Sequence, residues 1–163
     1  MDTIQQLKDE LTQEFEITKK FFEIYPEGKE DYAPHEKSMK LGPLVNHLAD
    51  IFNWPGFILD TEQLDFAKTD YRPASFKSRK ELLDVLNKNY NSSKEHLEQA
   101  KEADLEPSWS FANNGQILAK WTKYGAIRHA FSQAIHHRAQ LGVYYRLLNI
   151  PLPATYGPSA DSQ

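Results

Sequence analysis

The apolar residues of this chain recur at spacings of three and four in four long segments, and this periodicity limits the fold more than any other feature. The segments run over about 3–23, 39–54, 78–103 and 124–148, and proline, glycine and polar residues separate them. Four helices of this length have to bury their apolar stripes against one another. The pattern therefore predicts an all-α four-helix bundle with a long crossover between the second and third helices.

Polar side chains predict where these helices begin. Thr3 and Ser38 are expected N-caps of the first two helices, and Ser78 followed by Glu81 has the spacing of a capping box for the third. Pro43 fits only the first turn of the second helix, where its missing N–H would have no helical partner. The third helix is expected to extend to about Ala103.

Two connections differ in character. Residues 59–75 carry acidic residues and a proline, so we expect a long connection there rather than a core element. Residues 105–123 place Asn113-Asn114-Gly115 between two apolar stretches, which favours either a small β-hairpin or an ordered loop before the fourth helix.

Length and composition exclude several functional classes. A chain of 163 residues fits a single domain spanning 1–163, and the absence of cysteine leaves His, Asp, Glu and Gln as possible metal ligands. The net charge is -4 and the basic residues are scattered, so we expect no nucleic-acid partner. The N-terminal region lacks the pattern of a signal peptide and no apolar run is long enough to span a membrane, so we expect a cytoplasmic protein with no membrane partner.

Histidines on apolar helix faces form the candidate functional site. His137 lies on the apolar face of the fourth helix with Gln133 one turn before it, and His47 flanks the apolar stripe of the second helix. Neutral imidazole is the commonest protein ligand for divalent transition metals, so His47, Gln133 and His137 are the predicted metal ligands. His136 and His129 are alternative ligands, and an isolated buried histidine that only hydrogen-bonds within the core is the structural alternative for His47.

Other polar and aromatic residues have less specific predictions. His35 and His96 lie in polar surroundings and are expected to be solvated. Arg138 is expected either to pair with a carboxylate of a neighbouring helix or, with Gln140, to act on the metal ligands or the substrate. The larger aromatic residues are expected in the core more than in a pocket: Trp54, Trp109, Trp121, Tyr144 and Tyr145.

Two stretches carry a family resemblance. The segment His136-His-Arg-Ala-Gln-Leu-Gly-Val-Tyr-Tyr-Arg-Leu147, continued by 150–153 and 156–161, resembles the C-terminal signature of the DinB-like (DinB/YfiT) superfamily. The segment Ser38 to Leu44, with His47 and Trp54, resembles it too. The resemblance implies an up-down-down-up bundle, often a homodimer. The residues 156–161 themselves look like a tail that packs across the bundle near the mouth of the site, and we expect Asp161 to be solvated.

The resemblance also implies a chemistry. A nickel- or zinc-type metal would be held by His47 and His137, with Gln133 at a position where many members have His. Members of the superfamily include thiol-dependent transferases and isomerases, and others are labelled metal-dependent hydrolases. The resemblance therefore implies a small-molecule substrate and a low-molecular-weight thiol as an expected cofactor. Three outcomes follow for the metal: a weakened His-Gln-His site, a site completed by His136 or His129, or a degenerate site in a non-catalytic binding protein. We expect no carboxylate beside the His pair to act as a general base.

Overall fold

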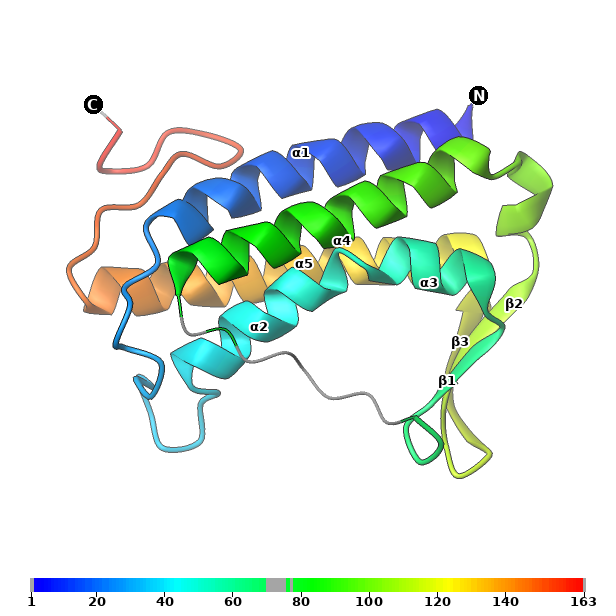
Figure 1. Cartoon of the computed structure of the whole chain (residues 1–163), viewed down its shortest axis with the longest axis horizontal. Helices are drawn as coiled ribbons and strands as arrows, with labels where there is room; N and C mark the ends of the chain where they lie inside the picture. The colour runs from blue at the N-terminus through cyan, green and yellow to red at the C-terminus, as the bar shows by residue number, and fades with distance from the viewer. Residues whose placement is uncertain (1, 70–75, 77, 163) are drawn as a thin grey trace.

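The computed structural model describes residues 2–69, 76 and 78–162, and its main part is helical (Figure 1). The helices are α1 (Thr3–Glu23), α2 (Leu41–Ile51), α3 (Trp54–Asp60), α4 (Arg79–Gln99), the short 3-10 helix η1 (Glu102–Leu105) and α5 (Lys123–Leu147). The strands are β1 (Gln63–Asp65), β2 (Ser108–Asn113) and β3 (Gln116–Thr122). None of the helices within these ranges is long and apolar enough to cross a membrane.

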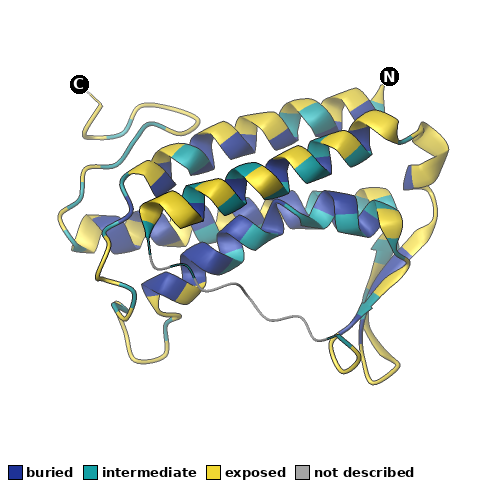
Figure 2. Ribbon diagram, viewed as in Figure 1, coloured by how far each residue is buried: buried dark blue, intermediate teal, exposed yellow. Residues whose placement is uncertain are grey.

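The core lies between four long helices. Helices α1 and α2 each pack against both α4 and α5, and the short α3 extends the layer of α2. Leu44, Leu86 and Leu141 are fully buried in this core, one each from α2, α4 and α5. Figure 2 shows the buried faces of the helices turned toward one another and the exposed faces turned outward. The prediction of a helix in each of the four apolar segments is therefore confirmed.

The fold is mostly helical, as predicted, but it is not purely α, because the structure also contains a three-stranded sheet in the order β1-β2-β3. Strands β2 and β3 pair antiparallel, with Trp109 opposite Trp121, and the turn between them places Asn114 and Gly115 at positive φ. The hairpin alternative for residues 105–123 is thus confirmed. Strand β1 pairs parallel to β2 and lies within the predicted connection 59–75, of which residues 70–75 fall outside the described ranges.

Asp65 fastens β1 to the hairpin. Its buried carboxylate accepts hydrogen bonds from the backbone N–H groups of Ala67, Asn114 and Gly115. Burial acts to raise the pKa of Asp65, but these N–H donors outweigh it, so the pKa is held below its usual value. The apolar periodicity predicted only a plain connection over residues 59–75. In the structure, Asp65 of this segment is bonded to the turn of the hairpin.

The helix ends were predicted with mixed success. Ser78 caps α4 by accepting a hydrogen bond from the N–H of Glu81, as expected. Asp2 rather than Thr3 caps α1, and no side chain caps α2, so Ser38 does not have the predicted role. Helix α4 ends at Gln99, and η1 follows where a continuous helix had been expected.

The second apolar segment is divided into α2 and α3. Pro55 occupies the first turn of α3, where its missing N–H costs nothing. The buried hydroxyl of Ser93 accepts a hydrogen bond from the N–H of Gly56 and donates one to the carbonyl of Phe52, so α4 satisfies the backbone at the break. This break sets the direction of α3 and hence the position of the Trp54 side chain relative to His47.

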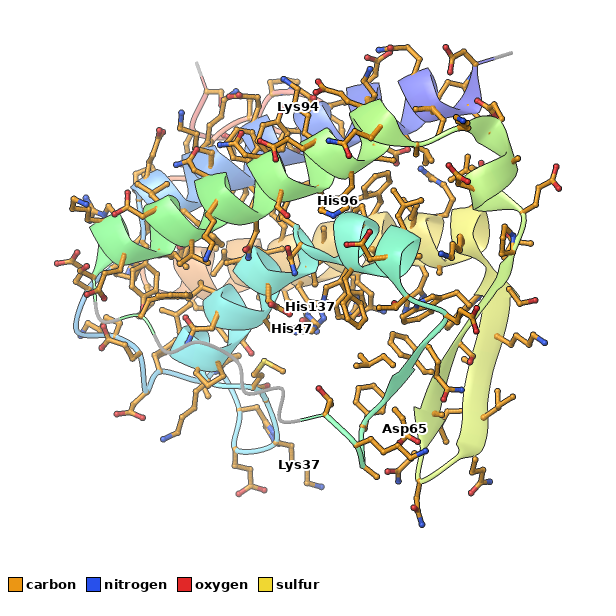
Figure 3. All side chains as sticks on the ribbon, turned by 45° about the vertical axis from the view of Figure 1, so that its right-hand side comes forward. Lys37, His47, Asp65, Lys94, His96 and His137 are labelled. Atoms are coloured by element: carbon orange, nitrogen blue, oxygen red, sulfur yellow. The ribbon has the colours of Figure 1, made fainter. Side chains whose placement is uncertain are left out.

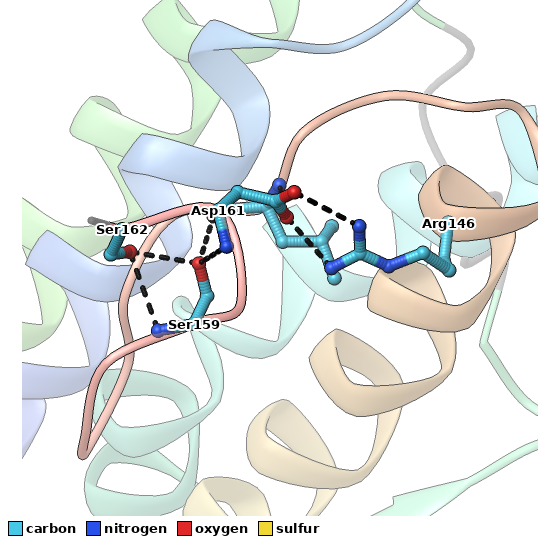
Figure 4. A network of polar contacts seen from close by, with 5 residues as sticks. Arg146, Ser159, Asp161 and Ser162 are labelled. Atoms are coloured by element: carbon cyan, nitrogen blue, oxygen red, sulfur yellow. Dashed lines mark hydrogen bonds and ion pairs between the residues drawn. The ribbon is translucent and has the colours of Figure 1, made fainter.

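The C-terminal tail packs against α1 and α5. The hydroxyl of Tyr156 contacts Glu14 of α1 and Arg138 of α5. Asp161 accepts two hydrogen bonds from the guanidinium of Arg146 and one from the N–H of Leu152 (Figure 4). Asp161 is exposed to solvent, as predicted, and its carboxylate also ties the tail to α5.

Candidate metal and ligand site

The structure brings His47 of α2 and His137 of α5 together, as predicted. Their ring centroids are 4.7 Å apart and the rings meet edge to face. Both side chains are half-buried and lie side by side below the core of the helices (Figure 3). The pair forms because α2 packs on α5 and each residue flanks the apolar stripe of its own helix.

Both imidazoles are held in the neutral form. Burial lowers the pKa of His47, the neighbouring His137 lowers it further, and Asp50 opposes this shift only in part. Burial likewise lowers the pKa of His137, although a hydrogen bond with Gln140 works against it. A neutral imidazole is the form that binds a metal, so neither ring needs to lose a proton first.

Two glutamines contact the ring of His137. Its Nε2 lies 3.1 Å from Oε1 of Gln133, and its Nδ1 lies 3.0 Å from Oε1 of Gln140. A neutral imidazole donates from one nitrogen and accepts at the other, so only one of the amides can offer its carbonyl and the other must turn its NH₂ to the ring. When Gln140 accepts from Nδ1–H, it orients the ring and leaves the lone pair of Nε2 directed toward Gln133.

The donor set of His47, Gln133 and His137 suits a weakly held divalent cation. Two neutral nitrogen donors and one amide oxygen carry no charge, so they bind less strongly than a set with a third imidazole or a carboxylate. Over residues 2–69, 76 and 78–162, no group of three His, Cys, Asp or Glu side chains stands in an arrangement that could hold a metal ion. A metal held by His47 and His137 would therefore need a third donor of another kind, such as the amide oxygen of Gln133.

The two alternative ligands lie on either side of this set. His136 is exposed, and its ring stands 5.0 Å from that of His137. His129 is half-buried one helical turn before Gln133, with its ring stacked on Trp121 at 4.9 Å. Burial lowers the pKa of His129 as well, so this third imidazole is also neutral.

A cavity of about 360 Å³ adjoins the histidine pair. Its wall is mostly apolar and is contributed by α2, α3, α5, β1 and β2. The lining residues are His47, Asp50, Asn53, Trp54, Phe57, Leu64, Phe66, Thr69, Phe111, His129 and Gln133. A concave apolar space of this size with a few polar groups is typical of a small-molecule site.

The sheet supplies aromatic groups that the sequence analysis did not assign to the site. Phe111 of β2 lies edge to face with Trp54 at 5.8 Å and stacks on Phe66 at 5.4 Å. Trp109, Tyr144 and Tyr145 are buried in the core as predicted, whereas Trp54 lines the cavity. Trp109 and Phe111 are two residues apart on β2, so both side chains lie on the face of the strand that packs against the helices. This spacing was the sequence pattern that could have predicted their position.

Asp50 was also missed. It follows His47 by three residues on α2, lines the same cavity, and accepts a hydrogen bond from Nε1 of Trp54 at 3.1 Å. The expectation that no carboxylate stands beside the His pair is therefore wrong. The spacing from His47 to Asp50 places both on one face of a helix, and this signal was present in the sequence.

Arg138 and His96 lie away from the cavity. Arg138 forms a buried ion pair with Glu14 of α1 at 2.5 Å, which confirms the predicted pairing with a carboxylate of a neighbouring helix. His96 bonds to Asp60 and to the carbonyl of Ser92, so the prediction of a solvated side chain is wrong there. His35 is exposed, as expected.

Comparisons with known proteins agree on one family. The sequence model of the DinB family matches residues 1–163. A DinB-like protein, YjoA, from Bacillus subtilis is 20% identical with a TM-score of 0.70, over 97% of this chain and 99% of that one. A DinB-like protein from Bacillus cereus is 18% identical with a TM-score of 0.72, over 93% and 97%. These structures share the fold, and the search of curated proteins found no match.

Proposed function

Since the chain belongs to the DinB family, we propose that it is a metal-dependent enzyme acting on a small organic molecule. The molecule would occupy the cavity beside the His pair, and a nickel- or zinc-type ion would bind to His47, Gln133 and His137. One observation carries this proposal: the imidazoles of His47 and His137, from different helices, converge at 4.7 Å, and His47 and Gln133 line an apolar cavity beside the pair. Helix packing thus exposes lone pairs next to a space for a ligand.

The residues of the cavity divide the work. Trp54, Phe66 and Phe111 hold the apolar part of the substrate, and Gln140 keeps the ring of His137 in place. A bound divalent ion would supply Lewis acidity, polarising the substrate or lowering the pKa of a water or thiol nucleophile. Hydrolysis needs a group that takes a proton from water, and Asp50 offers a carboxylate in the same cavity. Transfer to a low-molecular-weight thiol does not need this carboxylate.

Asp50→Asn separates the two reaction classes. If the reaction is hydrolysis, this variant should lose most of its activity while it still binds metal. If the reaction is thiol transfer, activity should persist. We further propose that α1, α2, α4 and α5 form the up-down-down-up bundle of the family and that the protein is a homodimer, which sedimentation at micromolar concentration tests.

Metal binding is the first test of the enzyme proposal. Protein purified without an affinity tag is titrated with Zn²⁺ and Ni²⁺ by calorimetry, and its metal content is measured by elemental analysis. We expect one ion per chain, lost in His137→Ala and retained in His35→Ala, which removes an exposed loop histidine. Loss in His136→Ala instead would assign the ligand to the neighbouring exposed residue. The absence of any binding would refute the metal site.

A second function is favoured by the contacts of His137. Both of its ring nitrogens face glutamine side chains, so the ring is satisfied without a metal. This arrangement supports a non-catalytic protein that binds a small ligand next to a degenerate metal site. In that case the native chain should bind no metal at millimolar concentration, while Gln133→His should create a site without producing activity.

A further inference from the structure

His129 lies in the cavity wall in contact with two aromatic rings. Its imidazole stacks on Trp121 at 4.9 Å with an interplanar angle of 25° and meets Phe111 edge to face at 6.0 Å. These contacts fix the plane of the ring, because stacking and edge-to-face packing together leave little rotation about the side chain. His129 is thus a rigid polar group in a largely apolar wall.

The ring nitrogens of His129 differ from those of two other half-buried histidines, His137 and His96, although His47 likewise forms no hydrogen bond among the described residues. His137 meets two amides, and His96 meets a carboxylate and a carbonyl. Among the described residues, no side chain or backbone group forms a hydrogen bond with His129. A half-buried polar group of this kind is satisfied by water or by a ligand. Because His129 lines the cavity, a molecule bound there can provide the missing hydrogen bond.

The rest of the wall favours a flat aromatic ligand. Phe66 and Phe111 stack at 5.4 Å, while Trp54 stands perpendicular to Phe111 at 5.8 Å. A planar ring can stack on one of these faces and meet another edge to face. The cavity of about 360 Å³ exceeds the roughly 150 Å³ that holds one benzene, so a ring with substituents fits.

The positions along α5 set the orientation. Gln133 follows His129 by one turn, a rise of about 6 Å, and His137 follows by about 12 Å. A ligand anchored at His129 therefore extends along the helix toward Gln133 and the His pair. One end of the cavity recognises the ligand, and the other end carries the candidate metal ligands.

We propose that His129 is the specificity-determining residue of this cavity and that the ligand is a small planar aromatic molecule bearing a hydroxyl group. The hydroxyl exchanges a hydrogen bond with the imidazole of His129, and the ring packs against Trp54 and Phe111. This inference rests on the proposed function in one respect, since it assigns the substrate to the same cavity. It differs from a metal role for His129, which would require the ring to turn away from Trp121.

Phenol and toluene form a matched pair of probes, because they differ mainly by a hydroxyl in place of a methyl group. We expect the full chain to bind phenol about fivefold more tightly than toluene in an NMR chemical-shift titration, the effect of one neutral hydrogen bond. His129→Phe should keep the aromatic stacking and lose this preference. His129→Gln, which keeps a hydrogen-bonding group, should retain part of it, and the spectra report whether each variant is folded.

The outcomes separate this inference from the proposed function. An unchanged phenol preference in a folded His129→Phe variant would overturn the role of His129, and failure of both probes to bind wild-type protein would overturn the ligand class. A zinc titration of the same variant is independent of both. Loss of zinc binding would make His129 a metal ligand and refute the inference. Lost phenol preference in a chain that binds no zinc would support the inference while the enzyme proposal fails.

Discussion

Two successive residues of α5, His137 and Arg138, face different neighbouring helices and meet very different surroundings. His137 faces α2, where its neighbours are a second imidazole and two neutral amides. Arg138 faces α1, where Glu14 neutralises its charge and Thr18 and Tyr156 accept further hydrogen bonds. The polar groups around His137 are neutral and can exchange their hydrogen-bond partners. The charge of Arg138, in contrast, is paired with that of Glu14.

The difference shows how a polar residue in a helical core can be assigned to stability or to function. The ion pair of Arg138 and Glu14 is 3% and 4% exposed at its side chains, so each charge depends on the other. The hydroxyl of Tyr156 closes the network by bonding to Glu14, and burial, ahead of that bond, raises the pKa of Tyr156 to about 12. The buried charges of this network neutralise each other and are assigned to stability, whereas His47 and His129 line the cavity and can take a ligand.

Breaking the ion pair between Arg138 and Glu14 should have the largest effect on stability. Arg138→Ala leaves the carboxylate of Glu14 buried without its cation, so the free energy of unfolding should fall by about 3–5 kcal/mol. Urea denaturation followed by circular dichroism measures this change. The double variant Arg138→Met with Glu14→Gln should recover most of the loss, because it removes both charges together. A cost below about 1 kcal/mol for the single variant would show that the ion pair is not essential.

A substitution beside the cavity should instead change the affinity of the protein for a metal. Gln133→His replaces an amide oxygen with an imidazole, so we expect zinc to bind at least about tenfold more tightly, or about 1.4 kcal/mol. Calorimetric titration gives the affinity, and the urea midpoint of the metal-free variant should change little. Ser132→His, one residue earlier on an exposed position of the helix, serves as the matched control. Equal gains in both variants would contradict the assignment of Gln133.

The contributions of His96 and His137 to the stability of the fold should depend on pH in opposite directions. The Ser92 carbonyl, followed by Asp60, raises the pKa of His96 above its unfolded value of about 6.5. Its bonds therefore stabilise the fold fully below about pH 6.5, and this contribution is lost as the pH rises through the folded pKa. His96→Gln should consequently cost more stability at about pH 5.5 than at about pH 8.5, as measured by urea denaturation.

For His137 the sign reverses. Its folded pKa is lowered, so the unfolded chain takes up a proton more readily and stability is lost as the pH falls below about 6.5. His137→Gln removes this penalty and should make the metal-free protein less sensitive to acid. The same pH dependence for both variants would contradict the opposite pKa shifts assigned to His96 and His137.

The smallest effect is expected at the end of the tail. Asp161 and Arg146 pair at the surface, where water screens the charges, so Asp161→Ala should lower the melting temperature by no more than about 2–4 °C. Differential scanning calorimetry measures this shift, and Ser162→Ala removes a neighbouring hydroxyl as a control (Figure 4). A much larger loss would mean that the tail supports the core network around Tyr156.

The helical part of the fold could be predicted because its signals are local. Apolar spacing located all four long helices, and Ser78 marked one start correctly. The sheet was harder to predict, since β1 has only three residues and pairs with β2, almost fifty positions away. A strand this short has no periodicity of its own, and Asp65 is held by a turn that the sequence places far downstream.

The candidate site could be predicted in part, because its helical residues also follow from local sequence patterns. His47, Gln133 and His137 follow from helix faces, and the structure brings them together. Phe111 and Phe66 enter the cavity only through the sheet, so helix patterns could not reveal them. Asp50 was within reach, because it stands one turn after His47 on the same helix.

The most direct measurement is a crystal structure of the untagged protein soaked with zinc, with X-ray data collected on both sides of the zinc absorption edge. The account predicts one anomalous peak per chain within bonding distance of His47, Gln133 and His137, with the ring of His129 still stacked on Trp121. No peak at this position, or a peak on the exposed His136 alone, would contradict the claim that α2 and α5 build a metal site at the wall of the cavity.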